Sequence, residues 1–198
     1  MDNDKPGSGT DKAALRSRLR FRRDHHFSSL DDFVRAIAFR AAPTPLRDLI
    51  ARASCVGGYV ARSSEAPVDG LLALATDVGV SIALPCFHGR DAVMGFAIWT
   101  PGDTLVTGPW RVDQPADCSL SAEPDLLLLP LLGFDRSGGR IGQGGGHYDR
   151  YCAAHPAALR IGIAWSVQEV DHIPAEPHDM PLDAVLTEQE WIVTGDRL

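Results

Sequence analysis

The sequence predicts a single α/β domain with a mostly parallel central sheet and helices on both faces. The first observation is the continuous apolar run 125–129, which ends at Pro130 and is typical of a strand buried on both faces. The second is the alternation of predicted strands and helices along the chain. The third is a length of 198 residues with 44% hydrophobic residues, which suits one domain with a sizeable core.

A polar stretch opens the chain. Residues 1–10 contain Pro6, Gly7 and Gly9 among mostly polar side chains, so we expect them to be disordered. The folded domain is therefore predicted over residues 11–198. No internal repeat or further low-complexity segment divides this domain.

The segment 11–23 is predicted to form a basic helix. Leu15 and Leu19 mark an apolar stripe at helical spacing. Basic side chains recur on an adjoining face at spacings of four, four and three residues: Lys12, Arg16, Arg20 and Arg23. In an isolated stretch such a face is usually solvated. Lys12 nevertheless stands out, because it is one of only two lysines among 19 basic residues.

A strand–helix–strand unit is predicted in the next part of the chain. Residues 29–41 first form a second helix, which ends before Pro43. The stretch 54–61 is apolar and β-compatible, 67–78 has a helical pattern, and 80–84 is again a strand. Because such units give right-handed crossovers between parallel strands, we expect these two strands to be parallel.

The second half of the chain is predicted to contain mainly strands. They are expected at 94–99, 125–129, 159–165 and 184–187, and the strand at 184–187 is expected to be the last one. Residues 113–124 are predicted to be a polar linker. Residues 147–155 contain no Gly or Pro and are predicted to be a helix, whereas 171–179 is expected to be irregular.

A glycine-rich loop lies between the central strand and the last predicted helix. Six glycines fall between positions 138 and 146, with Arg140 among them and His147, Tyr148, Asp149 and Arg150 directly after them. Glycines bring bare N–H groups close to a ligand, and the start of the following helix favours an anion. The loop matches neither G-x-x-x-x-G-K-[ST] nor G-x-G-x-x-G. The simple alternative is a glycine-rich turn without a ligand.

Composition and charge limit the classes of partner. A net charge of −7 argues against a general nucleic-acid or acidic-membrane binder. No apolar run approaches the ~20 residues of a membrane span, and the first residues lack an apolar signal, so we expect a cytoplasmic protein. The cysteines, Cys55, Cys86, Cys118 and Cys152, contain no C-x-x-C and are expected to be reduced thiols.

One segment is long and unusual enough to indicate a family. Residues 131–150, LLGFDRSGGRIGQGGGHYDR, resemble the signature of the 5-formyltetrahydrofolate cyclo-ligases, also called methenyltetrahydrofolate synthetases. Three other stretches resemble that family in the same order: K-x-x-L-R at 12–16, SCVGGYVARSSE at 54–65 and HDMPLDAVLTE at 178–188. The resemblance spans residues 11–192 and implies an α/β fold as well.

The resemblance implies a ligase that consumes ATP. In that reaction ATP and Mg²⁺ drive the closure of 5-formyltetrahydrofolate to 5,10-methenyltetrahydrofolate, and ADP and phosphate are released. A formyl group on nitrogen is a poor electrophile, so its oxygen is first phosphorylated and N10 of the substrate then attacks. A protein that catalyses this chemistry chiefly positions the reactants and spreads negative charge.

The resemblance also implies roles for individual residues. ATP is expected to contact Lys12, Arg16, Arg140, Ile141, Gly142, Gln143, Gly144, Gly145, Gly146, His147 and Tyr148. The folate is expected to contact Val60, Glu65, Gln143, Gly144, Gly145, Gly146 and His147. Asp149 and Asp179 are expected to bind Mg²⁺. His147 departs from the family, which often has an aromatic residue at that position, and Trp99 and Trp110 are expected to be packing residues.

Two other functions fit parts of the sequence. A zinc site would combine Cys152, His155, His172 and His178, although their spacing lacks a matched pair. The stronger alternative is a non-catalytic nucleotide- or RNA-binding relative of the same fold, which would not need the whole set Lys12, Arg16, Glu65, Arg140, Asp149 and Asp179. We expect ATP and 5-formyltetrahydrofolate as partners, no nucleic acid and no membrane, and a monomer with a homodimer as the alternative.

Overall fold

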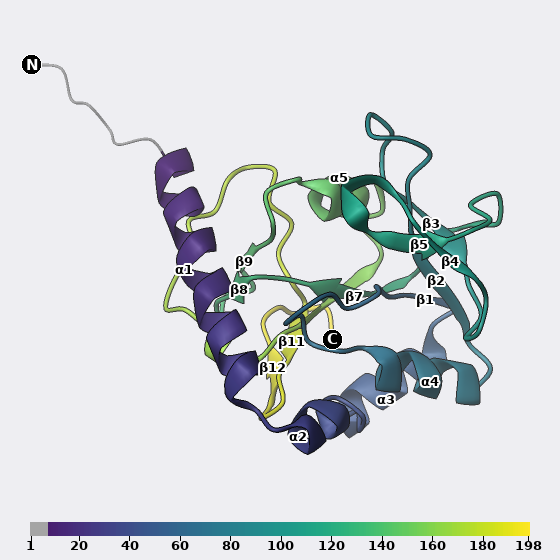
Figure 1. Ribbon diagram of the computed structural model, residues 1–198, viewed down its shortest axis with the longest axis horizontal. Coiled ribbons are helices and arrows are strands. Elements are labelled where there is room, and N and C mark those ends of the chain that lie inside the picture. Colours follow the sequence, from purple (N-terminus) through teal and green to yellow (C-terminus); the bar gives the residue numbers. More distant parts are fainter. Residues whose placement is uncertain (1–7) are drawn as a thin grey trace, which may run out of the picture.

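The computed structural model describes residues 8–198, with side chains from Lys12 onward (Figure 1). Its centre is an eight-stranded sheet in the order β12-β11-β10-β7-β1-β2-β3-β6. The strands span Cys55–Gly57 (β1), Ser81–Cys86 (β2), Gly95–Ile98 (β3), Ser121–Ala122 (β6), Leu126–Pro130 (β7), Leu159–Ile163 (β10), Ala184–Leu186 (β11) and Trp191–Val193 (β12). Neighbours from β11 to β2 pair in parallel, whereas β12, β3 and β6 pair antiparallel at the edges. The predicted mostly parallel α/β domain is therefore confirmed.

Helices cover both faces of the sheet, as predicted (Figure 1). They are α1 (Ser8–Ser29), α2 (Asp32–Ile37), α3 (Thr44–Arg52), α4 (Asp69–Asp77) and α5 (His147–Ala154). In the central strand β7, Leu126 and Leu128 join the buried cluster that contains α3 and α4. Leu127 and Leu129 join the cluster on the other face, which contains α5. Because successive side chains of a strand point to opposite faces, burial on both faces requires the continuous apolar run seen in the sequence.

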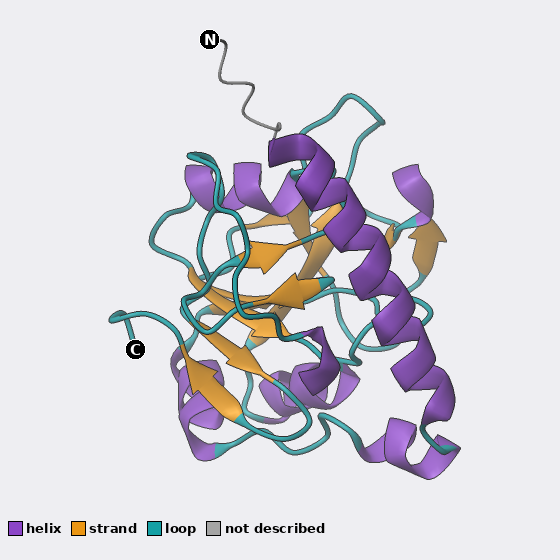
Figure 2. Ribbon diagram, turned by 90° about the vertical axis from the view of Figure 1, so that its left-hand side faces the viewer, coloured by secondary structure: helices purple, strands orange, loops and turns teal. Residues whose placement is uncertain are grey.

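Helix α1 runs along one side of the domain (Figures 1 and 2). Leu19 fixes it there, packed in a small buried cluster with Leu132, Ile141 and Ile173. The fit is close: a Cβ added to Gly133 would lie 2.5 Å from Leu19 Cδ1. The apolar stripe of α1 is thus held against the domain, and the basic face beside it is turned toward the region where the parallel strands end.

Two small two-stranded sheets complete the fold. One joins β4 (Leu105–Thr107) to β5 (Asp113–Pro115), and the other joins β8 (Gly133–Phe134) to β9 (Arg140–Ile141). Short 3₁₀ helices lie at η1 (Pro109–Arg111) and η2 (Ser166–Gln168). The β8–β9 hairpin follows β7 and contains the first two glycines of the predicted loop, Gly138 and Gly139, at its turn. The remaining glycines follow β9 and lead into α5.

Several predicted boundaries are wrong. Ser8–Thr10 belong to α1 rather than to a disordered tail, and residues 1–7 lie outside the described residues. Pro43 precedes α3, a helix that the sequence pattern did not reveal. The predicted linker 113–124 contains β5 and β6. The strand predicted as the last one is followed by β12, which pairs antiparallel with β11.

A disulfide joins Cys86 at the end of β2 to Cys118, so the expectation of reduced thiols is wrong for these two cysteines. Gln114 fills the space beside the bond: its Nε2 lies 3.3 Å from Cys118 Sγ, and it also donates to Phe87 O at 3.2 Å. Cys55 and Cys152 are free and buried. The disulfide thus ties the end of a parallel strand to the segment that follows β5.

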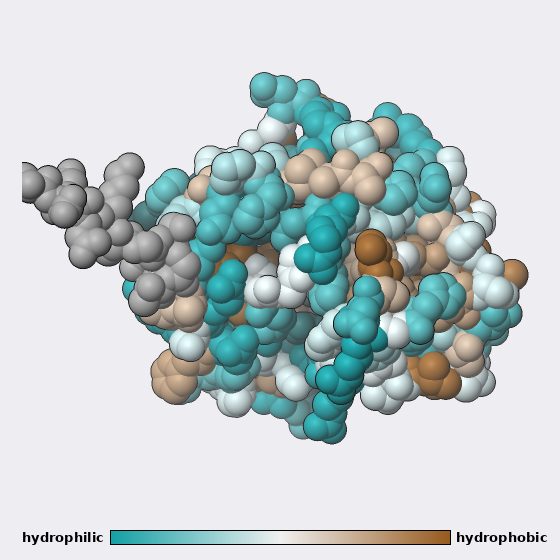
Figure 3. Space-filling model, turned by 90° about the horizontal axis from the view of Figure 1, so that it is seen from above, coloured by the Kyte–Doolittle hydropathy of each residue, from teal (hydrophilic) through white to brown (hydrophobic). Residues whose placement is uncertain are grey.

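The face of the described domain that is seen from above has no large apolar area (Figure 3). That face is mostly hydrophilic, and hydrophobic residues reach it in small separate areas (Figure 3). None of the helices in the described part of the chain has the length and apolarity of a membrane span. The apolar side chains are instead concentrated in the two layers beside the sheet.

Candidate functional site

A cavity of about 620 Å³ opens where the parallel strands end, between α1 and the glycine loop. Its walls include Tyr59 after β1, Phe87 after β2 and Leu131 after β7. Crevices at the carboxyl ends of parallel strands are the usual ligand sites of open α/β sheets. The position of this cavity therefore follows from the topology of the sheet.

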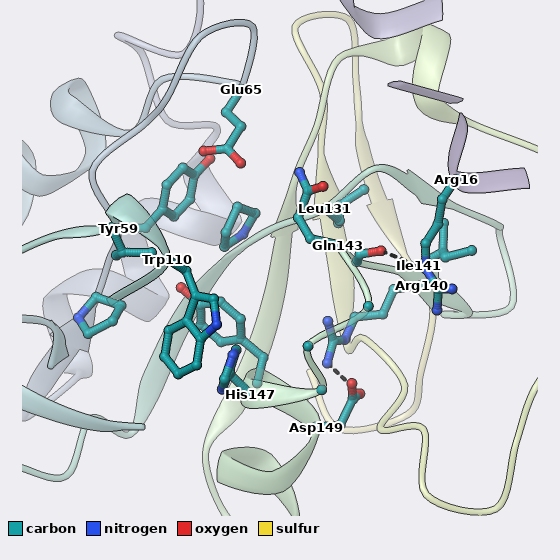
Figure 4. Close-up of a pocket in the computed structure, with 18 of the residues that line it drawn as sticks. Arg16, Tyr59, Glu65, Trp110, Leu131, Arg140, Ile141, Gln143, His147 and Asp149 are labelled. Atoms are coloured by element: carbon teal, nitrogen blue, oxygen red, sulfur yellow. Dashed lines mark hydrogen bonds and ion pairs between the residues drawn. The ribbon is translucent and has the colours of Figure 1, made fainter. Parts of the chain in front are cut away.

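All the residues predicted to contact ATP, folate or metal line this one cavity. They come from α1, from the segment after β1, from the glycine loop, from the start of α5 and from the irregular segment before β11. Figure 4 shows two groups that face each other across the cavity. Arg16, Arg140 and Asp149 lie on one side, here called the cationic side, and Tyr59, Glu65, Trp110 and His147 on the other, here called the aromatic side. Gln143 lies between them.

Lys12 is buried on the cationic side, with only 5% of its surface exposed. Its Nζ lies 2.7 Å from Asp179 Oδ2 and 2.9 Å from Glu176 Oε2. Burial works against the charge, but the hydrogen bonds to the two carboxylates outweigh it and raise the pKa of Lys12. Lys12 is therefore a fixed, fully charged ammonium rather than a solvated surface lysine.

Two further basic residues of α1, Arg16 and Arg20, hold the glycine loop. Arg16 Nε donates to Gly142 O at 3.2 Å, and Arg20 Nη2 donates to Gln143 Oε1 at 2.6 Å. The loop reaches α5 through Gly146, whose φ of 62° is in the left-handed region that glycine adopts without a steric penalty. No side chain caps the start of α5, so its first backbone N–H groups remain for an anionic ligand.

Arg140 and Asp149 form the floor of the cationic side. Arg140 is buried, and its Nη2 lies 2.5 Å from Asp149 Oδ1. Its Nε is also buried and has no hydrogen-bond partner among the described residues. Met180 N lies 3.5 Å from the same Asp149 oxygen, so α5 and the segment around Asp179 meet here. The fold thus brings together two aspartates that are thirty positions apart in the sequence.

A group of metal-binding type lies beside them. Glu176, His178 and Asp179 each offer a ligand atom, and these atoms lie within 4.8 Å of one another. The Lys12 ammonium lies between the two carboxylates of this group, which shows that this position accommodates a cation. Carboxylate oxygens are also the ligands that Mg²⁺ prefers. Asp149 does not belong to this group, and Glu176 was missed from the sequence because no local pattern marks a single loop glutamate.

Glu65 is the carboxylate of the aromatic side. Its side chain is 15% exposed, and its Oε2 accepts the backbone N–H of Arg62 at 3.0 Å. Burial raises the pKa of Glu65, while the Arg62 N–H and the nearby charge of Arg23 act in the opposite direction. Val60, half-buried, lies on the same wall. A carboxylate here presents acceptor atoms to any ligand that enters.

Three rings form a cluster on the aromatic side. The Trp110 ring centroid lies 4.5 Å from that of His147 and 5.0 Å from that of Phe87. Trp110 packs on these two rings, as expected, but it is also 39% exposed and lines the cavity. Trp99, by contrast, packs against the core as expected and donates from Nε1 to Asp103 O at 3.2 Å. The sequence alone does not show which way a tryptophan in a loop points, so it could not predict that the Trp110 ring lines the cavity.

The structure does not assemble the alternative zinc site. Cys152 is fully buried, and the His155 ring stacks on Tyr151 with centroids 4.1 Å apart. The His172 Nδ1 atom lies 4.0 Å from Asp135, and the His178 Nε2 atom lies 3.4 Å from Glu176. Within residues 8–198, these four side chains do not form a metal-binding group.

The chain is similar to proteins of one known family. The model of the 5-formyltetrahydrofolate cyclo-ligase family matches residues 8–188. The 5-formyltetrahydrofolate cyclo-ligase of Mycolicibacterium smegmatis is 35% identical over 149 residues, which cover 70% of this chain and 75% of that protein. The Escherichia coli K12 enzyme of the same name is 30% identical over 152 residues, covering 72% and 84%. The solved structure of Aquifex aeolicus 5,10-methenyltetrahydrofolate synthetase, 21% identical, has the same fold, with a TM-score of 0.72 over 93% of each chain. The chain belongs to the 5-formyltetrahydrofolate cyclo-ligase family.

Proposed function

We propose that this protein uses ATP to cyclise 5-formyltetrahydrofolate to 5,10-methenyltetrahydrofolate, with release of ADP and phosphate. The observation that carries the proposal is one cavity whose cationic side and aromatic side meet at Gln143. A triphosphate suits the first side, and a flat aminopyrimidine ring system suits the second. Membership of the cyclo-ligase family supports the same reaction.

On the cationic side we assign the ATP contacts to Lys12, Arg16 and the segment 140–148. Arg16 uses its Nε to hold Gly142, which leaves its two terminal nitrogens to bind phosphate oxygens. The buried Arg140 Nε, which has no partner in the described chain, is a further donor for this side. The bare amides of the glycine loop and of the α5 start complete an anion-binding surface.

On the aromatic side we assign the folate contacts to Val60, Glu65 and the segment 143–147. The two oxygens of an ionised Glu65 accept two N–H groups from the aminopyrimidine edge of the pterin. The Trp110 and His147 rings offer a flat surface for the ring system. The segment 143–147 borders both sides, so it contacts both substrates.

The reaction follows from bringing these two substrates together. The formyl oxygen attacks the γ-phosphorus of ATP, the bond from that phosphorus to the β-bridging oxygen breaks, and ADP leaves. The formyl carbon is now activated, N10 attacks it and loses its proton, and the C–O bond to phosphate breaks. The chain contributes orientation and positive charge: Arg16, Arg140 and Lys12 face the transferring phosphoryl group.

We assign Asp149 and Asp179 to Mg²⁺, with Glu176 as a further carboxylate beside them. When bound, Mg²⁺ supplies positive charge to the phosphate oxygens during transfer. The Lys12 ammonium, which occupies a cation position between Glu176 and Asp179, supports this assignment. Asp149 lies outside the group formed by Glu176, His178 and Asp179, so we assign it a contact through water.

We place the reaction in the cytoplasm, where ATP is available. A single copy of the chain suffices, because every residue assigned above lines one cavity of one chain. ATP and 5-formyltetrahydrofolate are the partners that this cavity requires.

The test is a direct assay of the purified protein. Methenyltetrahydrofolate absorbance and ADP are measured together after 5-formyltetrahydrofolate, ATP and Mg²⁺ are added, and each component is omitted in turn. We expect one ADP per methenyl product and no product when any component is missing. Binding of ATP without product would instead support a non-catalytic nucleotide-binding relative. The Glu65→Gln variant is the matched control for folate-dependent turnover.

A further inference from the structure

Arg23 is a buried arginine at the edge of the cavity, and none of the roles described above uses it. It lies in α1, is 4% exposed and lines the cavity. Its Nε donates to Ser64 Oγ at 2.9 Å, and Ser64 Oγ in turn donates to Asp24. The guanidinium is therefore held in one orientation. Its Nη1 is buried and has no hydrogen-bond partner among the described residues.

The unpaired end of Arg23 faces Glu65. Nη1 lies 4.0 Å from Glu65 Oε1, which is too long for a hydrogen bond but close for two buried opposite charges. A bidentate arginine contact would occupy both carboxylate oxygens. At this separation the positive charge compensates the carboxylate while Oε1 keeps its capacity to accept a hydrogen bond from a ligand.

Other charged or titratable groups around Glu65 do not replace this charge. Tyr59 and Tyr148 face it, and burial raises the pKa of both phenols, so they are neutral. Arg62 also acts on Glu65 but is exposed, and water and salt screen its charge. The Gln143 side chain contributes a neutral hydrogen bond. Arg23 is thus the buried cation beside a carboxylate whose burial raises its pKa.

We propose that Arg23 is a positioning residue for folate binding, which keeps Glu65 ionised with a free acceptor for the aminopyrimidine edge. This inference rests on the proposed function, because it names how the assigned folate carboxylate is maintained. The simpler role, in which Arg23 only ties α1 to the 62–65 segment, predicts a loss of stability and a folate affinity lowered equally at every pH.

The experiment measures the Glu65 pKa and the folate affinity in Arg23→Gln, Arg23→Lys and wild type. Carbon NMR of the labelled Glu65 carboxyl follows its titration in the ligand-free protein. We expect Arg23→Gln to raise the Glu65 pKa and Arg23→Lys to leave it close to wild type. Because only the ionised carboxylate binds, the 5-formyltetrahydrofolate affinity should fall about tenfold per unit of that rise at pH values below the wild-type pKa, and it should recover at higher pH.

Glu65→Gln serves as the matched control, because its affinity loss is independent of pH. ATP affinity is expected to be unchanged in the Arg23 variants. Should Arg23→Gln fail to fold, Arg23→Met keeps the apolar stem packed and is the second neutral variant. An unchanged Glu65 pKa in a folded neutral variant, or an affinity loss independent of pH, overturns the proposal. Failure of the wild type to bind 5-formyltetrahydrofolate contradicts the proposed function instead, since the carboxyl titration does not depend on the ligand.

Discussion

Lys12 Nζ lies 2.7 Å from Asp179 Oδ2, across a separation of 167 residues in sequence. The two residues are assigned to different ligands, the phosphates of ATP and Mg²⁺, yet without those ligands they neutralise each other. Although burial acts in the other direction, hydrogen bonds from Lys12 and from the Glu176 backbone lower the pKa of Asp179. Mg·ATP would therefore replace one ion pair by two: the metal with the carboxylate, and the phosphates with the ammonium.

Replacing Lys12 by alanine should weaken the binding of ATP far more than the binding of folate. The ammonium–phosphate contact is lost, so the KM for ATP is expected to rise well above the change in the KM for 5-formyltetrahydrofolate. Steady-state kinetics with each substrate varied in turn measures both constants. Arg18→Ala removes an exposed charge from the same helix and is expected to change neither. A larger effect on folate than on ATP would place Lys12 in the other half of the cavity.

Asp149→Asn and Asp179→Asn should each lower turnover sharply, and added Mg²⁺ should restore part of it. The combined loss is expected to be smaller than the product of the two separate losses, because both carboxylates serve one ion. Titrations of turnover with Mg²⁺ check this in the single and double variants. If Asp149 were only a favourable charge in the first turn of α5, its replacement would cost a few tenths of a kcal/mol of stability and leave turnover intact.

Lowering the pH should destabilise the wild-type protein through His147. Burial and the nearby charge of Arg150 lower the pKa of His147 below its ordinary 6.5. The unfolded chain therefore binds this proton first, and the free energy of unfolding falls as the pH drops through about 6.5 toward the lower folded-state pKa. Thermal unfolding between pH 5 and 7.5 should show a shallower pH dependence in His147→Phe than in wild type. Identical slopes in the two proteins would contradict this.

Reduction of the Cys86–Cys118 disulfide should loosen the aromatic side of the cavity. Phe87 follows Cys86 directly, and its ring packs on Trp110 and His147. We expect a higher KM for folate with the KM for ATP unchanged. The free energy of unfolding is expected to fall by about 3–4 kcal/mol, as the chain-entropy relation gives for a loop of this length. Kinetics and urea unfolding with and without a dithiol reductant measure both. The Cys118→Ser variant should not respond to the reductant; a response there would place the effect elsewhere in the chain.

Gly133→Ala should weaken the docking of α1. The added Cβ would lie 2.5 Å from Leu19 Cδ1 and 3.2 Å from the backbone oxygen of Gln168, so the buried Leu19 side chain must leave its packed position or α1 must move away. A cost of about 1–3 kcal/mol in the free energy of unfolding is expected, with a raised KM for ATP. Gly95→Ala, where nothing lies within 4 Å of the new Cβ, is the matched control in urea unfolding. Equal free energies of unfolding for the two variants would show that the contact between α1 and the hairpin repacks without a cost in stability.

The sequence was most informative where local pattern and burial agree. The apolar run of β7 and the glycines before α5 placed the centre of the sheet and the loop, because both follow from chain-local rules. The sequence pattern does not predict helix α3, because Pro43 stops a preceding helix as readily as it begins a new one, and the nine residues of α3 follow it directly. Glu176, Arg23 and the exposed ring of Trp110 could not be found, since their positions depend on contacts that only the folded chain makes. The disulfide joins residues 32 positions apart without a motif, so no spacing indicated it.

The contact between α1 and the segment around Asp179 also has a consequence for the order in which the chain assembles. Lys12 meets Glu176 and Asp179 across separations of 164 and 167 residues. Closing so large a loop costs conformational entropy before the contact itself stabilises the chain. Contacts between residues this far apart in sequence therefore form late in folding. The sheet can therefore form while the nucleotide end of the cavity is still open. A bound nucleotide would stabilise the docked position of α1, because it binds only after this last contact has formed. Protease cleavage within α1 should therefore slow when ATP is present.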